Sequence, residues 1–488
     1  MLWLGLLVLL MPNVTALPLR TSSLPTMQPH AAPSEADLKF AQEYLQHFYG
    51  YRPERNKRSA DPGENAGLTT GLCDKVQKMQ RFFGLPPSGE LTHETLAVMK
   101  RPRCGLSDVE NFGDKIRWRK RTLSYRISGN QFPISASTVR KIFKSAWGLW
   151  SSVALIKFRM RNNRETDIVI SFHNGDHSDG APFDGKGGVL AHAFMPGPEI
   201  GGDVHFDADE DWSINSTGIN LFAVAVHEFG HALGLPHSSD PGAIMYPSYN
   251  FSPNYELQLS YRDVKDIQLL YGVNPNLKNP PPRTPEKCDR DLSFDAVSEL
   301  QQEVLFFKDR FMWRKHPKFD ETRITMISSL WPDAVPPYLD AVYQNVENNL
   351  ILFFKGHQYW VLRQMKVEES FPRNISDLGF PSRIKSVDAA LHFRHEHYTL
   401  FFTGDECWRY NERLKMLEGS PMLIEQQWPG IPTPIDAAVF YDGFVHFFKG
   451  NLYYKYDSNS KRMVHTSYAN ELLECENKED NETLTDRR

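Results

Sequence analysis

The sequence predicts three folded regions of different class: an all-α region near the N-terminus, a central α/β (α+β) domain, and a C-terminal four-bladed β-propeller. Residues 35–104 alternate helical periodicity with turn residues, and residues 115–272 combine strand and helix patterns. Residues 288–475 repeat one short β pattern four times. A chain of 488 residues is long enough for about three such domains.

The composition is that of a globular protein. Hydrophobic residues make up 41% of the chain and charged residues 24%, which excludes a wholly disordered or collagen-like chain. The 55 Lys and Arg nearly balance the 60 Asp and Glu, so the net charge of −5 gives no support for nucleic-acid binding. An aromatic content of 12% favours β-rich packing.

The N-terminus indicates export. The apolar run from Leu2 to Met11 is too short to span a bilayer, and the small residues Val14 and Ala16 precede a possible cleavage point. This predicts a signal peptide over residues 1–16. No later segment reaches 18 apolar residues and the tail after Cys475 is polar, so we expect a secreted protein without a membrane anchor.

In the N-terminal region, apolar residues at helical spacing predict helices over residues 36–49, 73–83 and 92–99. The polar stretch between the first two helices should be an exposed loop. It contains the basic cluster Arg55–Arg58, which is either a cleavage site for trypsin-like or furin-like proteases or a plain solvated charge run.

The central region combines both element types. The patterns predict strands at 122–127 and 167–172 and helices at 137–153, 221–235 and 261–271. Residues 274–287 hold five prolines, which predicts a stiff linker before the C-terminal region.

The C-terminal region is built from four repeats. An Asp-Ala pair recurs at Asp295, Asp340, Asp388 and Asp436, and each is followed by a Phe-Phe pair. Four such units predict a four-bladed propeller, which fits better than two packed sheets because every repeat keeps the same internal order. Cys288 and Cys475 bracket the repeats, so a disulfide between them would close the ring. The other cysteines, Cys73, Cys104 and Cys407, include at least one unpaired thiol.

One motif carries catalytic chemistry. His227 and His231 are four residues apart on one face of the predicted helix, and Gly234 lets the chain turn so that His237 can supply a third imidazole. Three imidazoles leave one tetrahedral position of Zn²⁺ open for water. Glu228 can then act as the general base, and Met245 fits a Met-turn beneath the metal.

A second group of metal-binding residue types lies upstream. Four protein ligands would close a tetrahedral, structural zinc site; the candidates are His177, Asp179, His192 and His205. The neighbouring Gly/Asp-rich loops 183–190 and 201–210 offer hard oxygen ligands for Ca²⁺, although plain turns with solvated carboxylates would give the same pattern.

Cys104, in Arg-Pro-Arg-Cys-Gly, is a candidate for silencing the first site. A thiolate placed on the open position of the zinc would displace water. The alternative is an ordinary buried or disulfide-bonded cysteine.

Together these motifs closely resemble the matrix metalloproteinases, secreted zinc proteases of the metzincin class, along essentially the whole chain. The resemblance implies a signal peptide at 1–16, a propeptide with a cysteine switch at 17–112, a catalytic domain at 113–272, a Pro-rich hinge at 273–287, a hemopexin-like four-bladed propeller at 288–475 and a polar tail at 476–488.

The resemblance also assigns roles to residues. Cys104 would be the switch, held in place with help from Arg103, and Glu228 the catalytic base. It implies two zinc ions, on the two sets of ligands named above, and several calcium ions. One calcium site would use Asp184, Gly185, Gly187, Val189, Asp207 and Glu210, and a second Asp167, Glu199, Gly201 and Asp203. The specificity pocket would be lined by Ala223, Pro247 and Tyr249.

Some positions depart from the family pattern. The switch reads PRCGLSD where PRCGVPD is usual, Glu199 stands where relatives often have Gly, and Ala223 replaces a frequent Leu, which would widen the pocket. Cys407 replaces a usual aromatic residue.

The function implied by this resemblance is that of a latent zinc endopeptidase acting on extracellular matrix proteins such as collagen. Its expected partners are matrix substrates, activating proteases that begin at Arg55–Arg58 and finish near 113–117, and protein metalloprotease inhibitors. Asp240 and Gly242 resemble collagenase residues, whereas Ile219 replaces the expected Tyr, which leaves the stromelysin-type and enamelysin-type branches of the family as alternatives. The alternative is a catalytically silent, hemopexin-type matrix-binding protein.

Overall fold

The computed structural model describes residues 33–475, apart from nine internal segments. These are 54–69, 110–115, 130–131, 163–164, 215–217, 250–256, 278–279, 332–334 and 364–365. The predicted signal peptide, the basic cluster Arg55–Arg58, most of the expected final cleavage region and the polar tail lie outside the described residues. No helix among the described residues is long and apolar enough to cross a membrane.

Three helices form the N-terminal region, as the periodicity predicts. They are α1 (Glu35–Tyr49), α2 (Thr70–Phe82) and α3 (His93–Met99). The side chains of Ser34 and Thr92 accept backbone N–H groups at the starts of α1 and α3, which satisfies donors that a helix leaves free. The three helices share one core with Tyr246 of the central domain.

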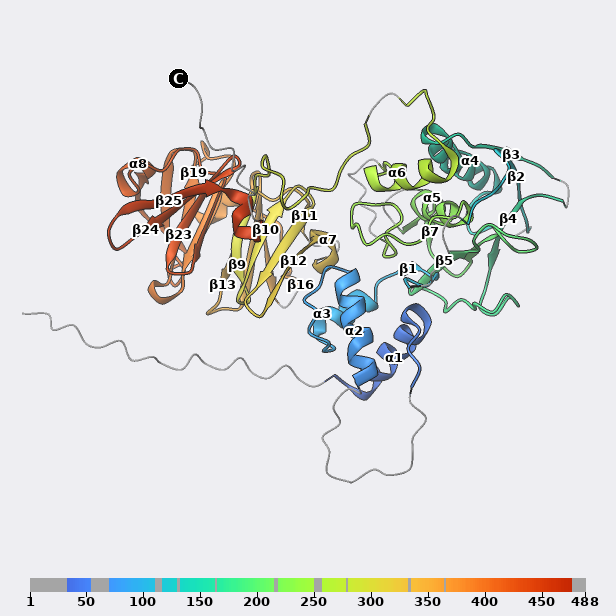
Figure 1. Cartoon of the computed structure of the whole chain (residues 1–488). Coiled ribbons are helices and arrows are strands. Elements are labelled where there is room, and N and C mark those ends of the chain that lie inside the picture. The colour runs from blue at the N-terminus through green and yellow to red at the C-terminus, as the bar shows by residue number, and fades with distance from the viewer. Residues whose placement is uncertain are drawn as a thin grey trace, which may run out of the picture.

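The central domain is a six-stranded mixed sheet with helices packed on it (Figure 1). The strand order is β1-β5-β6-β4-β2-β3, with bounds β1 (Arg103–Cys104), β2 (Thr122–Ile127), β3 (Lys157–Met160), β4 (Ile168–His173), β5 (Val189–Ala193) and β6 (Val204–Asp207). The helices are α4 (Ala136–Val153), α5 (Leu221–Ala232) and α6 (Tyr261–Tyr271). A short ladder pairs β7 (Trp212–Ser213) with β8 (Ile219–Asn220).

Aromatic packing holds α4, α5 and the sheet together. Trp147 of α4 is stacked on Phe229 of α5 with 3.7 Å between ring centroids, and on Phe158 of β3 with 4.2 Å. Because α5 is buried over nearly its whole length, the residues it carries are held rigidly.

The structure differs from the predicted elements at three places. Strands β5 and β6 occupy segments predicted as loops, because their short runs are bounded by glycines and contain polar histidines. Strand β3 carries Lys and Arg at alternate positions and was not predicted. Helix α5 ends at Ala232 rather than Leu235.

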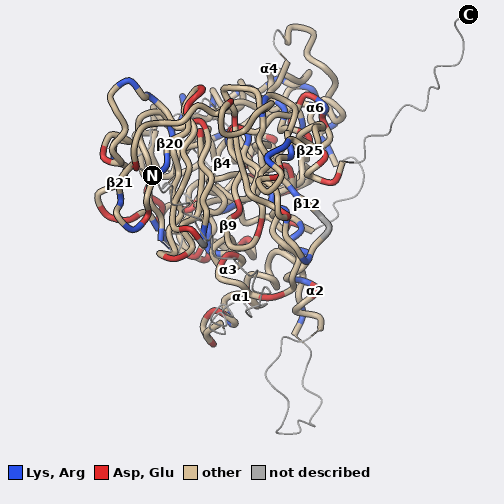
Figure 2. The backbone as a smooth tube through the Cα atoms, turned by 90° about the vertical axis from the view of Figure 1, so that its left-hand side faces the viewer, with Lys and Arg blue, Asp and Glu red and all other residues tan. Residues whose placement is uncertain are grey.

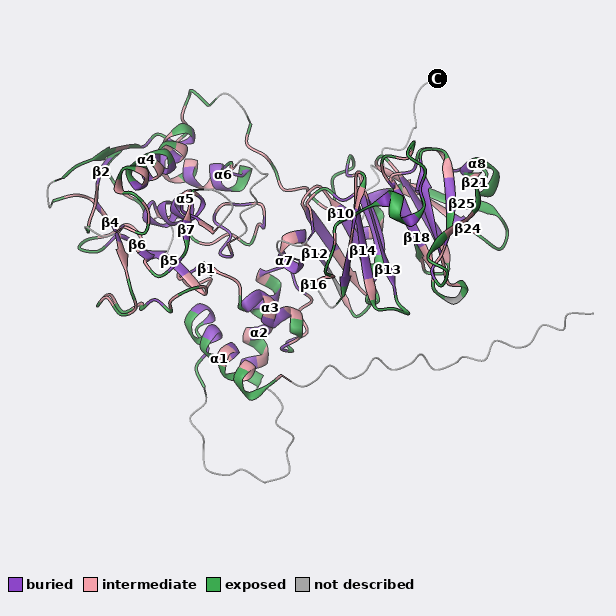
Figure 3. Ribbon diagram, turned by 180° about the vertical axis from the view of Figure 1, so that it is seen from behind, coloured by how far each residue is buried: buried purple, intermediate pink, exposed green. Residues whose placement is uncertain are grey.

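The C-terminal region is a four-bladed propeller, as predicted. Its four sheets are β9-β10-β11-β12, β13-β14-β15-β16 with β17, β18-β19-β20-β21 and β22-β23-β24-β25. The innermost strands β9 (Ala296–Leu300), β13 (Ala341–Asn345), β18 (Ala389–Phe393) and β22 (Ala437–Tyr441) each contact the next, and β22 contacts β9, which closes the ring. Most residues of these inner strands are buried (Figure 3).

The remaining blade strands complete each sheet outward. They are β10 (Glu303–Lys308), β11 (Phe311–His316), β12 (Phe319–Met326), β14 (Leu350–Lys355), β15 (Gln358–Arg363), β16 (Lys366–Val367), β17 (Arg373–Asn374), β19 (Tyr398–Thr403), β20 (Glu406–Asn411), β21 (Met416–Leu423), β23 (Phe444–Lys449), β24 (Leu452–Asp457) and β25 (Arg462–Tyr468). Short helices α7 (Ile327–Leu330), α8 (Ile424–Gln427), η1 (Ile375–Leu378), η2 (Arg394–Glu396) and η3 (Ala469–Leu473) join or flank them. A disulfide joins Cys288 to Cys475, so the first and last blades are covalently tied.

The repeated Asp-Ala pair has a structural role. The Asp340 carboxylate accepts the Gly356 backbone N–H at 2.6 Å and the Lys355 ammonium at 2.7 Å, which fixes the turn after the Phe-Phe strand. Asp436 makes the same pair of contacts with Gly450 and Lys449. The Asp of the repeat therefore recurs because each of these blades needs a carboxylate to hold this turn.

The N-terminal region also contacts the propeller (Figure 1). The guanidinium of Arg314 on β11 is paired with Glu303 of its own blade at 2.7 Å and with Glu94 of α3. The Arg101 guanidinium donates to the Ser328 backbone oxygen of α7 at 2.6 Å. The first blade is thus held against the N-terminal helices by partly buried charge-assisted contacts.

Candidate active site and metal centres

Helix α5 carries His227, Glu228 and His231, and specific residues fix where it starts and where the chain leaves it. The Asn220 side chain accepts the Ala223 N–H at 3.0 Å and caps the first turn. Gly234 follows the helix with φ +103°, and a Cβ there would collide with the backbone oxygen of Ile116. Only glycine can make this turn, which returns the chain so that His237 faces the helix.

Met245 lies beneath the histidines, as the Met-turn prediction expects. Its side chain is 2% exposed, and its sulfur occupies the place where a Cβ of Gly230 would lie. Asp263 of α6 fixes this turn, because its carboxylate accepts the N–H groups of Ile244 at 2.8 Å and Met245 at 3.1 Å. Asp263 is a positioning residue that the sequence analysis did not single out.

The imidazoles are oriented for a cation. Nδ1 of His227 donates to the Ile244 oxygen at 2.7 Å and Nδ1 of His231 donates to the Leu235 oxygen at 2.6 Å, which leaves each Nε2 unprotonated. The two Nε2 atoms are 3.1 Å apart. Two facing lone pairs repel unless a cation lies between them, and Nε2 of His237 is likewise buried without a hydrogen-bond partner. The residues therefore fit a zinc ion.

Burial sets the protonation of these groups. It lowers the pKa of His227 to about 3 and also lowers the pKa values of His231 and His237, so all three imidazoles are neutral at pH 7. Neutral imidazole is the form that binds a metal. Burial raises the pKa of Glu228 to about 8, and both of its carboxylate oxygens lack a hydrogen-bond partner.

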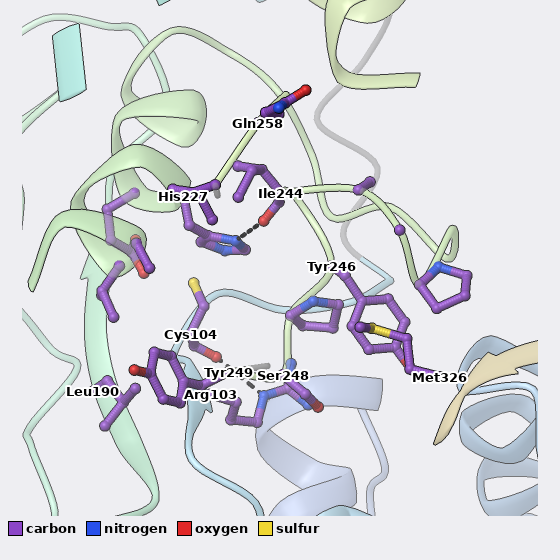
Figure 4. Close-up of a pocket in the computed structure, with 18 of the residues that line it drawn as sticks. Arg103, Cys104, Leu190, His227, Ile244, Tyr246, Ser248, Tyr249, Gln258 and Met326 are labelled. Carbon is purple, nitrogen blue, oxygen red and sulfur yellow. Dashed lines mark hydrogen bonds between the residues drawn. The ribbon is translucent and has the colours of Figure 1, made fainter. Parts of the chain in front are cut away.

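Cys104 lies at the same point (Figure 4). Its sulfur and one nitrogen of each of His227, His231 and His237 lie within 4.8 Å of one another. Burial raises the pKa of the Cys104 thiol, with the nearby Glu228 carboxylate as a further cause. A thiolate at this position would need a neighbouring cation to stabilise it.

The backbone around Cys104 fills the cleft as an added strand. On one side, Arg103 N–H donates to the Gly188 oxygen and Gly105 N–H to the Ala191 oxygen, both at 2.8 Å. On the other side, Cys104 N–H donates to the Pro247 oxygen at 3.0 Å. An extended substrate would need the same backbone groups, so this segment and a substrate exclude one another.

Arg103 anchors the added strand, as the resemblance implied. Its guanidinium is buried, lies 3.6 Å from the Phe48 ring and forms a two-pronged pair with Asp108, at 2.6 Å and 3.2 Å. It also bonds the Tyr44 hydroxyl. Asp108 Oδ1 lies 2.9 Å from His237 Nδ1. Asp108 is the last residue of the PRCGLSD motif, and its place after the Arg-Cys pair is the sequence signal for this contact, which the prediction did not use.

The second predicted zinc set also comes together. One oxygen of Asp179 lies 2.7 Å from His177 Nε2 and 2.8 Å from a nitrogen of both His192 and His205. His177 Nε2 and His205 Nδ1 are 3.2 Å apart. All four side chains belong to the central domain, and together with the Cys104 cluster they are the two metal-type groups found among the described residues.

The first predicted calcium set is a group of crowded carboxylates. Burial raises the pKa values of Asp184, Asp207 and Glu210, and the negative charges of these neighbours add to the effect at Asp207 and Glu210. One oxygen of Asp207 is buried without a hydrogen-bond partner. Hard oxygens with unrelieved negative charge fit Ca²⁺. Gly185 and Gly187, in the same loop, both have positive φ, and Val189 N–H donates to Asp184 at 3.0 Å.

The second predicted calcium set fits a cation less well. Burial raises the pKa of Asp203 to about 6, but the Asp167 carboxylate is paired with the Lys120 ammonium and accepts both polar groups of Ser124. Glu199 has φ +58°, a left-handed conformation that explains the glycine usual there, and a Cβ on Gly201 would meet the backbone of Gly197.

The predicted specificity pocket is a cavity beside His227. Ala223, Pro247 and Tyr249 line it, and the Tyr249 hydroxyl accepts the Asn220 N–H at 2.8 Å. Arg310 and Met326 of the propeller also contribute to its lining. Sequence reasoning missed these two, because no local pattern shows that the first blade reaches the catalytic domain.

The loop of Asp240 and Gly242 lies where the catalytic domain, the linker and the propeller meet. The Asp240 carboxylate accepts the Thr284 hydroxyl of the linker at 2.6 Å. A Cβ on Gly242 would collide with Thr284 and approach Phe311 of the propeller. Cys73 and Cys407 are free thiols, and Cys407 is fully buried in the propeller.

Comparisons with known families agree with this geometry. The Matrixin peptidase family profile matches residues 117–272, and the Hemopexin profile matches four times, at 294–333, 339–382, 387–433 and 435–475. A peptidoglycan binding domain profile matches residues 34–99. With the histidine cluster on α5, these matches define a zinc metalloendopeptidase with a helical N-terminal region and a propeller.

The relatives are similar over almost their full length. The chain is 41% identical to human (Homo sapiens) neutrophil collagenase over 90% of this chain and 94% of the relative. It is 42% identical to bovine (Bos taurus) interstitial collagenase over the same shares, and 40% identical to matrix metalloproteinase-18 of Xenopus laevis over 93% and 97%. The chain therefore belongs to the matrixin family, the matrix metalloproteinases.

Proposed function

We propose that this chain is a secreted, latent zinc endopeptidase of extracellular matrix proteins, and that residues 17–112 are a propeptide whose proteolytic removal activates it. The observation that carries the proposal is the position of the Cys104 sulfur, within 4.8 Å of the ligand nitrogens of His227, His231 and His237. One residue of the N-terminal region thus stands where a water molecule is needed.

Zinc, when bound by the three imidazoles, supplies a Lewis acid that polarises a peptide carbonyl and acidifies water. Burial favours the protonated form of Glu228, whereas the positive charge of a bound zinc ion would favour its carboxylate form. In that form Glu228, next to His227 on α5, would take a proton from the attacking water and return it to the leaving amine. The backbone oxygens of Gly188, Ala191 and Pro247 accept N–H groups of residues 103–105 in this structure. The same oxygens would accept the N–H groups of an extended substrate.

The substrate's side chain next to the cleaved bond would enter the cavity at Ala223. The small methyl group of Ala223 leaves this cavity wide, so a large apolar side chain is favoured there. The collagenases among the relatives and the contact of Asp240 with the linker support collagen as a substrate. Through that contact, the cleft and the first blade can engage one extended substrate.

Further parts of the proposal concern ions, compartment and partners. Calcium would stabilise the loop of Asp184, Asp207 and Glu210 by relieving their mutual repulsion; the set of Asp167, Glu199, Gly201 and Asp203 remains a weaker candidate. Activating proteases would cut first at Arg55–Arg58. Protein metalloprotease inhibitors would compete for the same cleft once the propeptide has left.

The test is activation of the purified full-length chain with an organomercurial or with trypsin, followed by assays on a quenched peptide, native type I collagen, gelatin and casein. Peptide hydrolysis that begins only after activation supports a latent enzyme, and cleavage of native collagen supports the substrate class. Absence of hydrolysis after complete removal of residues 17–112, with zinc bound, would instead favour the silent matrix-binding protein.

A further inference from the structure

The catalytic domain carries a basic surface that hydrolysis does not use. Residues 115–164 contain 13 of the chain's 55 Lys and Arg and none of its 60 Asp and Glu. The whole chain has a net charge of −5, so this one segment is opposite in sign to the rest. Such a concentration of positive charge attracts polyanions.

The structure gathers part of this charge on strand β3. Phe158 stacks on Trp147 of α4, so the alternation of side chains turns Lys157 and Arg159 to the opposite, outer face of the sheet. Arg161 continues the same alternation, since its N–H still donates to the Tyr125 oxygen at 2.8 Å. The three cations are thus spaced along one line at steps of about 6.6 Å.

Helix α4 carries three further exposed cations, Arg140, Lys141 and Lys144, but it packs on the Phe158 side of the sheet, opposite to Lys157 and Arg159. We therefore call only the exposed side chains of Lys157, Arg159 and Arg161 the β3 basic surface.

These cations are available for a ligand. Two nearby cations are neutralised, Lys120 by Asp167 and Arg126 by the charge of Asp203. By contrast, no side chain of the β3 basic surface forms a hydrogen bond or ion pair with another residue that the structure describes. Within the described part of the chain, their charges therefore have no protein counter-charge at hydrogen-bonding distance.

The surface is also separate from the cleft. In the strand order β1-β5-β6-β4-β2-β3, β3 is one edge and β1, which carries Cys104, is the other. Strand β3 lies at the end of the molecule away from the propeller (Figure 1). A ligand on β3 would therefore not obstruct the cleft, whether or not residues 103–105 occupy it.

We propose that the β3 basic surface binds a sulfated linear polysaccharide of the glycosaminoglycan class. Exposed guanidinium and ammonium groups bind sulfate through charge-assisted hydrogen bonds, and a line of cations matches a linear polyanion. The large apolar side chains exposed on this surface are Leu155 and Met160, and neither offers the aromatic platform that single-stranded nucleic acid uses. This binding does not depend on the proposed protease activity.

The test uses the full-length latent chain and heparin. We compare the triple variant Lys157→Gln/Arg159→Gln/Arg161→Gln with a control that removes the same charge from the propeller, Lys366→Gln/Lys415→Gln/Lys461→Gln. The propeller is a suitable control because basic and acidic residues are interspersed over it (Figure 2). We expect the β3 variant to elute from heparin at lower salt, to bind at least about tenfold more weakly and to show a shallower salt dependence of log Kd, because fewer counter-ions are released. The control should behave as the parent chain.

Equal losses in both triple variants, or no loss in either, would overturn the proposal. A second control, Arg140→Gln/Lys141→Gln/Lys144→Gln, removes the same charge from α4 on the other side of the sheet and should bind heparin as the parent chain does; a loss as large as that of the β3 variant would refute the assignment to β3. Desulfated heparin, a DNA oligonucleotide and phosphatidylserine vesicles are compared at the same salt. Binding to DNA or vesicles as tight as to heparin would refute the assignment to a sulfated polysaccharide, and so would undiminished binding to desulfated heparin.

Discussion

The two clusters of metal-binding residue types in the central domain, which we propose as a catalytic and a structural zinc site, differ in where their fourth side chain originates. In the first cluster, His227, His231 and His237 come from the central domain, whereas Cys104 comes from the N-terminal region. In the second, all four side chains belong to loops and strands of the central domain, with Asp179 at their centre.

Under the proposed function, this difference separates a site that opens on activation from one that stays closed. A cut between the N-terminal and central regions would remove Cys104 and free one position, while no cut there would change the Asp179 cluster. The first cluster also has a buried acidic neighbour, Glu228. Similar donor sets would therefore support catalysis in one place and stability in the other.

The largest effect should follow from Glu228→Gln in the activated enzyme. Removing the general base should lower kcat by about 10²–10⁴-fold while zinc content stays unchanged. Peptide hydrolysis and metal analysis measure this, with Glu425→Gln on the exposed α8 as the matched control. Undiminished hydrolysis would show that Glu228 is not the base.

The next effect should follow from Cys104→Ser in the uncleaved chain. A hydroxyl is a much poorer zinc ligand than a thiolate, so the variant should hydrolyse a peptide without organomercurial treatment. Cys73→Ser is the matched control, because Cys73 is a free thiol in the same region but lies outside both clusters. If Cys104→Ser stays latent, the Cys104 thiolate is not what blocks the first cluster.

The third effect should follow from Asp179→Asn, which removes the negative charge of the carboxylate that contacts His177, His192 and His205. We expect the bound zinc to fall from two ions to one per chain and the midpoint of thermal unfolding to drop, since a structural metal stabilises the folded state. Metal analysis and calorimetry measure these effects. Asp176→Asn, at an exposed carboxylate of the same loop, should retain both ions; equal zinc loss in the two variants would argue against a specific site at Asp179.

A smaller effect is expected where the propeller supports the N-terminal region. Arg314→Met leaves Glu94 and Glu303 without their cation and should weaken the contact by about 2 kcal/mol. Trypsin should then activate the latent chain faster, while the activated enzyme keeps its kcat/KM. Arg383→Met removes a comparable but exposed pair with Glu406 within the propeller and should leave activation unchanged. Equal activation rates in all three proteins would show that the propeller contact does not support latency.

Local patterns predicted most elements of the fold. Strand β2 and helix α6 have the bounds that alternation and periodicity predict, and the four Asp-Ala repeats predicted a propeller that the structure confirms. Strands β3, β5 and β6 were missed because each is short and carries charged or histidine side chains that hide the alternation. These strands form because they pair with strands that lie elsewhere in the sequence, and a local pattern does not show such pairing.

The sequence by itself determined the chemistry: which imidazoles, carboxylate and thiol are present, and that two of the histidines share one face of a helix while a third follows it after a glycine turn. Only the tertiary structure decided that Asp108 lies against His237, that Arg314 joins the first blade to α3, and that the cations of β3 line the edge opposite the cleft. The physical reason is that side-chain spacing along a helix or strand is set by local geometry. Contacts between distant segments are set instead by the packing of the whole chain.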